Sequence, residues 1–447
     1  MKRTVLLLAL AGALLLGACA GESNLPVATG KANVRSINAI MASPNISFKI
    51  EERTIGEVGY KNVSPQGRYD DLDYTFNFDV FFAGDTATTR IASQHVDFVA
   101  DQDYTMLISG TLAAPVVTVW ESTGRAFDLS DTVFQAQFAH TSNTLGAVDY
   151  YFAAAGVAPV TGQEVATLSF GEITDPIDLE SGLYVMTITT AGDPLDILYT
   201  SDEAQFAAQS IMIITPFDGD ANDVAPVIVR ALAAVGATFS MPDSSYPATV
   251  EFLHAAPDLG TSDIYDDEIL LSQVIADHSY QELTAAIPLL AGDHTFRYTP
   301  AGSTAAVTLE GTLAAESGVR YRFVALGANG AYSTATLIPN LRPVDTSAKI
   351  LLLQTSNNFA ELDFYFVGRG EAIAEADPFR TAINSGLQAL PAALAAGSFD
   401  IYVTDSGAKD ILAGPVQIDV VLGDVVDIVV FDTVDPAVLD LRILPAP

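Results

Sequence analysis

The sequence repeats one pattern four times, and this repetition constrains the fold more than any other feature. Four stretches align without gaps: INAIMASPNISFKI from Ile37, FAHTSNTLGAVDYY from Phe138, FLHAAPDLGTSDIY from Phe252 and LLQTSNNFAELDFY from Leu352. One position of the alignment holds Ser47, Asp149, Asp263 and Asp363, which lie 102, 114 and 100 residues apart. A period of this length is that of a domain, because solenoid repeats are much shorter. We therefore predict four tandem copies of one domain.

Each copy consists of short runs rich in Val, Ile, Thr, Tyr and Phe, separated by Gly, Pro, Asp and Asn, a pattern that predicts strands and hairpins. The best helical candidate, residues 382–397, is interrupted by Gly386 and Pro391. Copies of this size with roughly seven strands are typical of immunoglobulin-like sandwiches. We predict an all-β chain, a tandem array of four immunoglobulin-like β-sandwich domains over residues 32–121, 133–233, 246–339 and 348–447.

The first residues have the pattern of an export signal. A charged start at Lys2 and Arg3 precedes a mostly apolar run from Val5 to Leu16, which is too short to span a bilayer. The following Gly-Ala-Cys resembles the bacterial lipobox, in which the chain is cut before a cysteine that carries diacylglycerol. We therefore expect a signal peptide over residues 1–18, lipid on Cys19 and a tether over residues 19–31; a chance cysteine after an ordinary signal peptide is the alternative.

Several acyl chains on one residue would anchor the protein stably to a membrane. The next residue is Ala20 rather than aspartate, which by resemblance to the sorting rule of Gram-negative lipoproteins implies the outer membrane, facing the periplasm or the cell surface. Downstream, no run of about eighteen apolar residues occurs, so no transmembrane helix is expected.

The third copy carries a resemblance to a known family. Its segments VEFLHAAPDLGTSDIYDD, YQELTAAIPLLAGDHTFRY and LAAESGVRYRFVALG resemble the bacterial secreted repeats called domain of unknown function 4397. The first copy keeps ASPN but has Ser47 in place of the aspartate. The resemblance implies exported or lipid-anchored proteins with β-sandwich domains and no assigned activity, and it supplies no catalytic residues.

A histidine stands nine residues before an aspartate in two copies, which raises the question of catalysis. The histidine position is occupied by Asn38, His140, His254 and Gln354, all able to hydrogen-bond, but only two are bases near neutral pH. We therefore predict that each pair braces the turn between the first two strands, with catalysis or metal ligation as the alternative. The predicted braces are His140, Asp149, His254, Asp263, Gln354 and Asp363.

The charge excludes some partners. There are 55 Asp and Glu against 20 Lys and Arg, a net charge of -35, which disfavours nucleic acid and anionic headgroups. High-salt adaptation or a merely solvated acidic surface would both explain it. No established catalytic signature occurs, so we predict a non-enzyme; a hydrolase with scattered carboxylates stays open.

One acidic segment is a candidate calcium loop. DGDAND presents Asp218, Asp220 and Asn222 in alternation, but the twelfth position is Val229 rather than glutamate, so we expect a hairpin turn without metal, with a calcium site as the alternative. No other cofactor is expected. Trp120 is expected in the core or at a domain junction.

Taken together, these features predict a lipid-anchored bacterial envelope protein with a binding, adhesion or spacer role. Its partners would be the membrane, through Cys19, and another envelope protein or a glycan. A calcium- or carbohydrate-binding surface module is the alternative.

Overall fold

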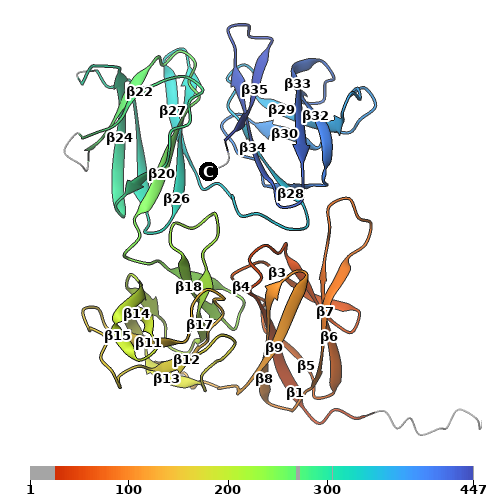
Figure 1. The fold of residues 1–447 in the computed structure, drawn as a ribbon, viewed down its shortest axis with the longest axis vertical. Helices are drawn as coiled ribbons and strands as arrows, with labels where there is room; N and C mark the ends of the chain where they lie inside the picture. Colours follow the sequence, from red (N-terminus) through yellow and green to blue (C-terminus); the bar gives the residue numbers. More distant parts are fainter. Residues whose placement is uncertain (1–25, 268–271, 305, 446–447) are drawn as a thin grey trace, which may run out of the picture.

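The computed structural model describes residues 26–267, 272–304 and 306–445. Within these ranges the regular elements are β-strands, arranged in eight sheets that form four two-layered sandwiches, which confirms the predicted all-β tandem array (Figure 1). Cys19 and the tether up to residue 25 lie outside the described residues. No helix in the described part of the chain is long and apolar enough to cross a membrane.

The first two repeats have these strands. Repeat 1 contains β1 (Lys31–Asn38), β2 (Ile46–Ile50), β3 (Arg53–Val58), β4 (Asn62–Val63), β5 (Gly67–Asp70), β6 (Asp73–Val80), β7 (Thr89–Asp97), β8 (Gln102–Thr111) and β9 (Ala114–Thr123). Repeat 2 contains β10 (Val133–Phe138), β11 (Val148–Ala153), β12 (Ala166–Leu168), β13 (Ile177–Glu180), β14 (Gly182–Thr190), β15 (Asp193–Thr200), β16 (Ala204–Phe206), β17 (Ile211–Asp218), β18 (Val227–Ala233) and β19 (Thr238–Met241).

The last two repeats are more regular, with four strands in each described sheet. Repeat 3 contains β20 (Ala248–His254), β21 (Ser262–Asp266), β22 (Ser272–His278), β23 (Ile287–Leu289), β24 (Gly292–Pro300), β25 (Leu309–Ala315), β26 (Arg320–Ala328) and β27 (Ala331–Leu337). Repeat 4 contains β28 (Ala348–Gln354), β29 (Glu361–Gly368), β30 (Arg380–Asn384), β31 (Ala392–Leu394), β32 (Gly397–Asp405), β33 (Ile411–Val420), β34 (Val425–Asp432) and β35 (Leu439–Leu444).

One boundary differs from the sequence prediction, while the segment considered as a helix agrees with the predicted all-β fold. β19 pairs with β18 through Met241 and Val229, so repeat 2 extends beyond the predicted boundary at residue 233. The strand was missed because it is only four residues long and its alternation is brief. The helical candidate of repeat 4 instead forms β30 and β31, joined by a turn in which Gly386 has a φ of 76°.

All four sandwiches share one plan. The first strand of each repeat pairs in parallel with a late strand, as β1 with β8, β10 with β17, β20 with β26 and β28 with β34. We call the sheet that contains this parallel pair the junction sheet and the other sheet the outer sheet. Each sandwich has its own core between the two sheets; in repeat 1, for example, Phe76 and Phe78 of the outer sheet pack with Met106 of the junction sheet. Burying a side chain of this kind stabilises a fold by roughly 1.5–3 kcal/mol.

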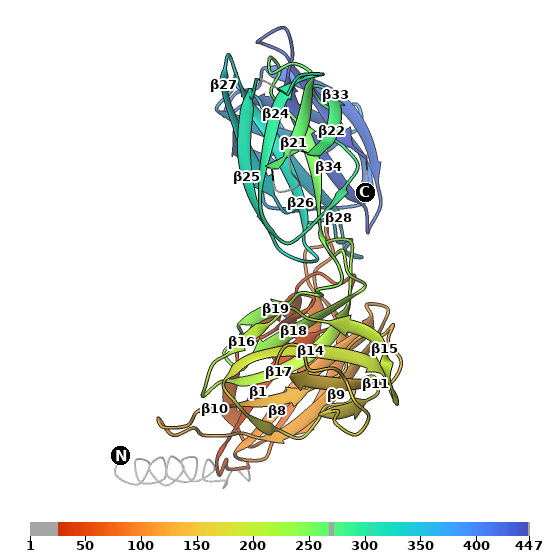
Figure 2. The same cartoon turned by 90° about the vertical axis from the view of Figure 1, so that its left-hand side faces the viewer.

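The repeats are arranged in pairs rather than in single file. Repeats 1 and 2 form one lobe and repeats 3 and 4 the other, with a narrow waist between the lobes (Figure 2). Within each lobe the two junction sheets face each other across an apolar layer. Ile37, Leu107 and Trp120 meet Ile213 and Phe217 in the first lobe, while Leu253 and Val324 meet Leu353, Val429 and Phe431 in the second.

Candidate functional site at the repeat junctions

The position that alternates between histidine and amide has the same contact in repeats 2, 3 and 4. The ring nitrogen Nε2 of His140 lies 2.8 Å from the carbonyl oxygen of Gly146, and that of His254 lies 2.9 Å from the carbonyl oxygen of Gly260. The amide of Gln354 donates to the carbonyl oxygen of Phe359 at 2.8 Å. These side chains are buried, and each carbonyl belongs to the loop between the first two strands of its repeat.

Burial also opposes a proton-transfer role for the histidines. Desolvation lowers the pKa of His140 and of His254 below the usual value, so both rings are neutral near pH 7. In His278, which lies against His254 at a ring distance of 5.4 Å, burial and then the neighbouring ring lower the pKa to about 4. These rings are packed and hydrogen-bonded in the interior rather than presented to a substrate.

The aspartates serve a different turn from the one predicted. Asp149 accepts hydrogen bonds from the backbone N–H of Gly192 at 2.7 Å and from the hydroxyl of Thr167. In the later repeats, the second carboxylate oxygen of Asp263 or Asp363 accepts in the same way from Gly302 or Gly407, at 2.8 and 2.9 Å. Each glycine is in the hairpin turn that follows β14, β24 or β32.

The reason for this difference is the position of the aspartate in the outer sheet. Asp149 on β11 pairs with Thr189 on β14, so its side chain lies beside the β14–β15 turn rather than the loop after β10. The histidine and the aspartate of one repeat therefore brace different turns.

Repeats 2 and 4 contain a further brace that sequence reasoning missed. The carboxylate of Asp218, at the end of β17, accepts hydrogen bonds from Ser142 and from the backbone N–H groups of Asn143 and Thr144. The carboxylate of Asp432, at the end of β34, binds the matching segment 356–358. A signal was available, because each TSN triplet, at 141–143 and 355–357, is matched by an aspartate that ends a late strand.

The backbone carbonyl oxygens of the same two aspartates each accept a hydrogen bond from a tyrosine of the preceding repeat. Tyr60 of repeat 1 donates its hydroxyl to the carbonyl oxygen of Asp218 at 2.6 Å, and Tyr280 of repeat 3 donates to that of Asp432 at 2.9 Å. Trp120 is buried at the first of these junctions and donates from Nε1 to the carbonyl oxygen of Gly171 at 2.8 Å, which confirms its predicted place. The two lobes thus share the same tyrosine contact between their paired repeats.

The second junction also buries a charged cluster. The guanidinium of Arg322 on β26 donates to Asp427 on β34 at 2.6 Å and to Glu251 on β20 at 3.3 Å, and all three side chains are buried. Ile213 in the first junction is equivalent to Asp427 in the second, because they lie five residues before Asp218 and Asp432, respectively. The two junctions share their geometry but differ in polarity.

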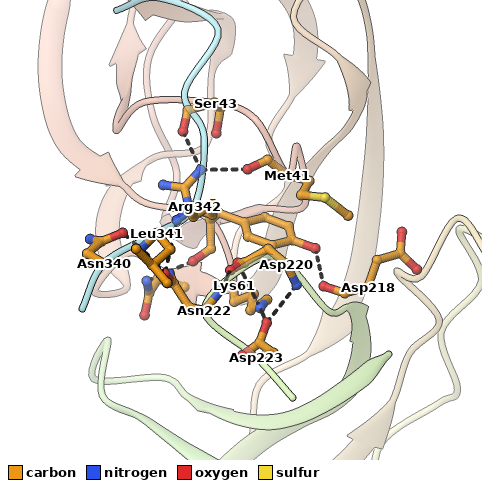
Figure 3. A network of polar contacts seen from close by, with 12 residues as sticks. Met41, Ser43, Lys61, Asp218, Asp220, Asn222, Asp223, Asn340, Leu341 and Arg342 are labelled. Atoms are coloured by element: carbon orange, nitrogen blue, oxygen red, sulfur yellow. Dashed lines mark hydrogen bonds and ion pairs between the residues drawn. The ribbon is translucent and has the colours of Figure 1, made fainter. Parts of the chain in front are cut away.

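The candidate calcium residues lie at the waist between the lobes and point to different partners (Figure 3). Asp220 and its neighbour Asp223 both form ion pairs with the ammonium of Lys61 from repeat 1. Asp218 holds the loop after β10, and Asn222 accepts from the backbone N–H groups of Leu341 and Arg342. The lysine cation occupies the place between the carboxylates, and within the described ranges no group of three or more His, Cys, Asp or Glu is arranged to hold a metal. This geometry does not support the calcium alternative.

The linker between repeats 3 and 4, residues 338–347, belongs to the second lobe and contacts repeat 1 of the first lobe. Arg342 donates from Nη1 to the carbonyl oxygens of Met41 and Ser43 in repeat 1, at 2.5 and 2.8 Å (Figure 3). Backbone hydrogen bonds from Asp345 to Ala42 and from Ala83 to Thr346 continue this contact. The linker is thereby fixed against repeat 1 rather than free in solvent.

One buried Asp–His pair was not singled out by the sequence. His294 Nδ1 lies 2.8 Å from the carboxylate of Asp266, and Nε2 lies 2.8 Å from the carbonyl oxygen of Leu290. Both ring nitrogens are engaged, so this pair has no nitrogen directed at a nucleophile. It braces the outer sheet of repeat 3.

The sequence matches the model of a known protein family. The model described as domain of unknown function (DUF4397) matches residues 32–151 and 248–365, more than half of the chain. The chain belongs to this family. Each DUF4397 match begins at the first strand of an odd-numbered repeat and ends in the second strand of the next repeat, so the two matches lie in the same register.

The chain was also compared with curated proteins and with solved structures. No curated protein matches the chain. Among solved structures, the Bacillus anthracis TIE protein is similar at 12% sequence identity over 91% of this chain and 69% of that chain, with a TM-score of 0.15.

Proposed function

We propose that this DUF4397 protein is a lipid-anchored bacterial envelope protein whose sandwiches have a non-catalytic binding, adhesion or spacer role. The observation that carries the proposal is that the polar side chains of the repeated motif are used inside the fold. His140, His254 and Gln354 hold loop carbonyls, and Asp149 holds a hairpin turn. Because these polar groups hold the turns in place, the fold can present its surface loops in a fixed arrangement to a partner.

The arrangement in two lobes supports the same role. Apolar junctions within each lobe and the Lys61, Asn222 and Arg342 contacts at the waist limit motion between repeats. Rigid placement of loops lowers the entropy lost when a partner binds. The partner would be another envelope protein or a glycan, as the sequence predicted.

Lipid on Cys19 and export to the outer membrane rest on the sequence alone. The test is incorporation of radiolabelled palmitate in cells expressing the full chain or Cys19→Ser. We expect label and outer-membrane fractionation for the first chain, and loss of both for the variant. Label that persists in Cys19→Ser would contradict the anchor.

The binding role is tested by cross-linking in intact cells, followed by identification of the captured partner. A reproducible envelope partner supports the proposal. Turnover of glycan, ester or peptide substrates by the purified chain, lost on substitution of His140 or His254, would contradict it and favour the hydrolase alternative.

A further inference from the structure

A pocket of about 440 Å³ opens where repeat 1, the linker and repeat 4 meet; we call it the inter-lobe pocket. Its size falls within the range of about 300–1,000 Å³ that is typical of small-molecule sites. The side chains that matter for its chemistry come from all three segments: Asn45, Glu57, Phe81, Asn340, Arg342 and Lys349.

Lys349, at the start of β28, is a buried cation in the wall of this pocket. Its side chain is 7% exposed, and its ammonium donates to the side-chain oxygen of Asn340 at 2.7 Å and to the carbonyl oxygen of Arg342. Within the described ranges no carboxylate forms an ion pair with it. Burial of a charge is unfavourable, and this burial, followed by repulsion from Arg342, lowers the pKa of Lys349 to about 8 against the smaller, opposite effect of Asp220.

Arg342 places a second positive charge on the same wall. Its guanidinium donates to two backbone carbonyls and lies 5.7 Å from the ring of Tyr60, but none of the ion pairs among the described residues includes it. Asp220 and Asp223 lie near enough to raise the pKa of Arg342, but both form their ion pairs with Lys61. Two cations without an ion-paired carboxylate of their own therefore line one pocket. An entering anionic group would supply the missing charge, and a carboxylate matches both an ammonium and a guanidinium donor.

The remaining wall favours a sugar as the carrier of that carboxylate. Phe81 is 49% exposed and presents an apolar ring, while Asn45 and Asn340 offer amide groups that can bind hydroxyls. An aromatic face beside a few fixed polar groups is the composition of a small-ligand site. We propose that the inter-lobe pocket binds the carboxylate of a uronic acid residue in an acidic glycan. This inference rests on the proposed binding role and names its ligand class.

Glu57 limits the charge of the ligand. Its carboxylate also lines the pocket, so the wall carries two positive charges and one negative charge, and the chain as a whole has a net charge of -35. This balance favours a carboxylate, which carries one negative charge, over a phosphate, which concentrates up to two negative charges on a single group. Selectivity for uronate over phosphate is therefore a specific consequence of the proposal.

The test is isothermal titration calorimetry on the purified full chain with digalacturonate, neutral galactobiose and inorganic phosphate. We expect binding of digalacturonate only. Lys349→Met keeps the length of the side chain and removes its charge, and should weaken binding about tenfold or more, the loss expected for a charged hydrogen bond. Phe81→Ala, at an exposed position that does not endanger folding, should also weaken it.

Lys409→Met is the matched control. Lys409 in repeat 4 also donates to two backbone carbonyls, those of Ile373 and Ala376, but it does not line the pocket. Equal binding of galactobiose, equal binding of phosphate, no heat with digalacturonate at millimolar concentrations, or equal losses in Lys349→Met and Lys409→Met would each overturn the inference. Cross-linked partners that persist in cells after such a result would leave the proposed function standing, so the two failures are distinguishable.

Discussion

Tyr60 and Tyr280 occupy matching places in the two lobes, each donating its hydroxyl to the backbone carbonyl of an aspartate in the following repeat. The Tyr60 bond is buried and the Tyr280 bond is partly buried, and the pKa of each tyrosine is raised, first by burial and then by nearby aspartates. These tyrosines are thus hydrogen-bond donors throughout the physiological range. They fasten each odd-numbered repeat to its even-numbered neighbour.

Removing either hydroxyl should loosen one lobe and leave the other intact. Tyr60→Phe and Tyr280→Phe each delete one hydrogen bond between repeats, at a cost of about 1 kcal/mol in the free energy of unfolding. Limited proteolysis and urea unfolding of the full chain will show which lobe is affected. If both substitutions destabilise the same lobe, the equivalence of the two junctions is wrong.

His140→Gln should be nearly silent, because Gln354 already makes the matching contact in repeat 4. His140→Ala, by contrast, removes the side-chain partner of the Gly146 carbonyl and opens a cavity, at a cost of about 1–3 kcal/mol. Urea unfolding compares the two variants with the parent chain. A large loss of stability in His140→Gln would contradict the brace, and lost binding with intact stability would point to a functional histidine.

The charged cluster of the second junction should be replaceable as a unit but not in part. Arg322→Met leaves Glu251 and Asp427 buried without their main cation, which should cost about 3–5 kcal/mol. Substituting all three residues by Leu or Met should be close to neutral, since Ile213 occupies the place of Asp427 in the first lobe. Chemical unfolding measures both variants, and a triple variant as unstable as Arg322→Met would contradict this account.

The stability of repeat 3 should fall as pH is lowered through the range set by His278. The ring is neutral in both states above its ordinary pKa of 6.5; below that pH the unfolded chain takes up a proton that the folded chain refuses until about pH 4. The difference corresponds to roughly 3 kcal/mol lost over this range. Unfolding at several pH values should show a smaller loss in His278→Gln, whose side chain does not titrate. Identical pH profiles would contradict this account, because they would show that the ring takes up a proton as readily in the folded state as in the unfolded state.

Calcium should not raise the melting temperature of the chain. The ammonium of Lys61 already forms ion pairs with both Asp220 and Asp223 at the waist. Differential scanning calorimetry with millimolar calcium, and again on Asp220→Ala, checks this expectation. A calcium-dependent rise that Asp220→Ala abolishes would restore the metal-binding alternative.

The strands and their fourfold repetition followed from the sequence, because alternating apolar residues and the register marked by Asp149 and Asp263 are local patterns. The pairing of repeats did not follow, although a clue was present. The runs 350–353 and 428–431 are continuously apolar rather than alternating, which indicates strands buried on both faces. The partner of the second face is not specified by any local pattern.

The waist was beyond sequence reasoning for a related reason. Lys61 meets Asp220 across 159 residues of sequence, and Arg342 meets Ser43 across 299. Acidic residues in a turn have the same local pattern whether they bind a metal, a lysine or water. The tertiary arrangement alone decides among these.

The pairing of repeats also bears on how such a chain can change its length. The two family matches begin at residues 32 and 248 and end at residues 151 and 365, so each covers an odd-numbered repeat with the first two strands of its neighbour, and this register occurs once in each lobe. A chain with an odd number of sandwiches would expose an apolar face such as that of Ile37, Leu107 and Trp120 to water. We therefore expect sandwiches to be gained and lost in pairs during evolution. The number of sandwiches then stays even, because the apolar junction sheet of each added sandwich is covered by that of its partner.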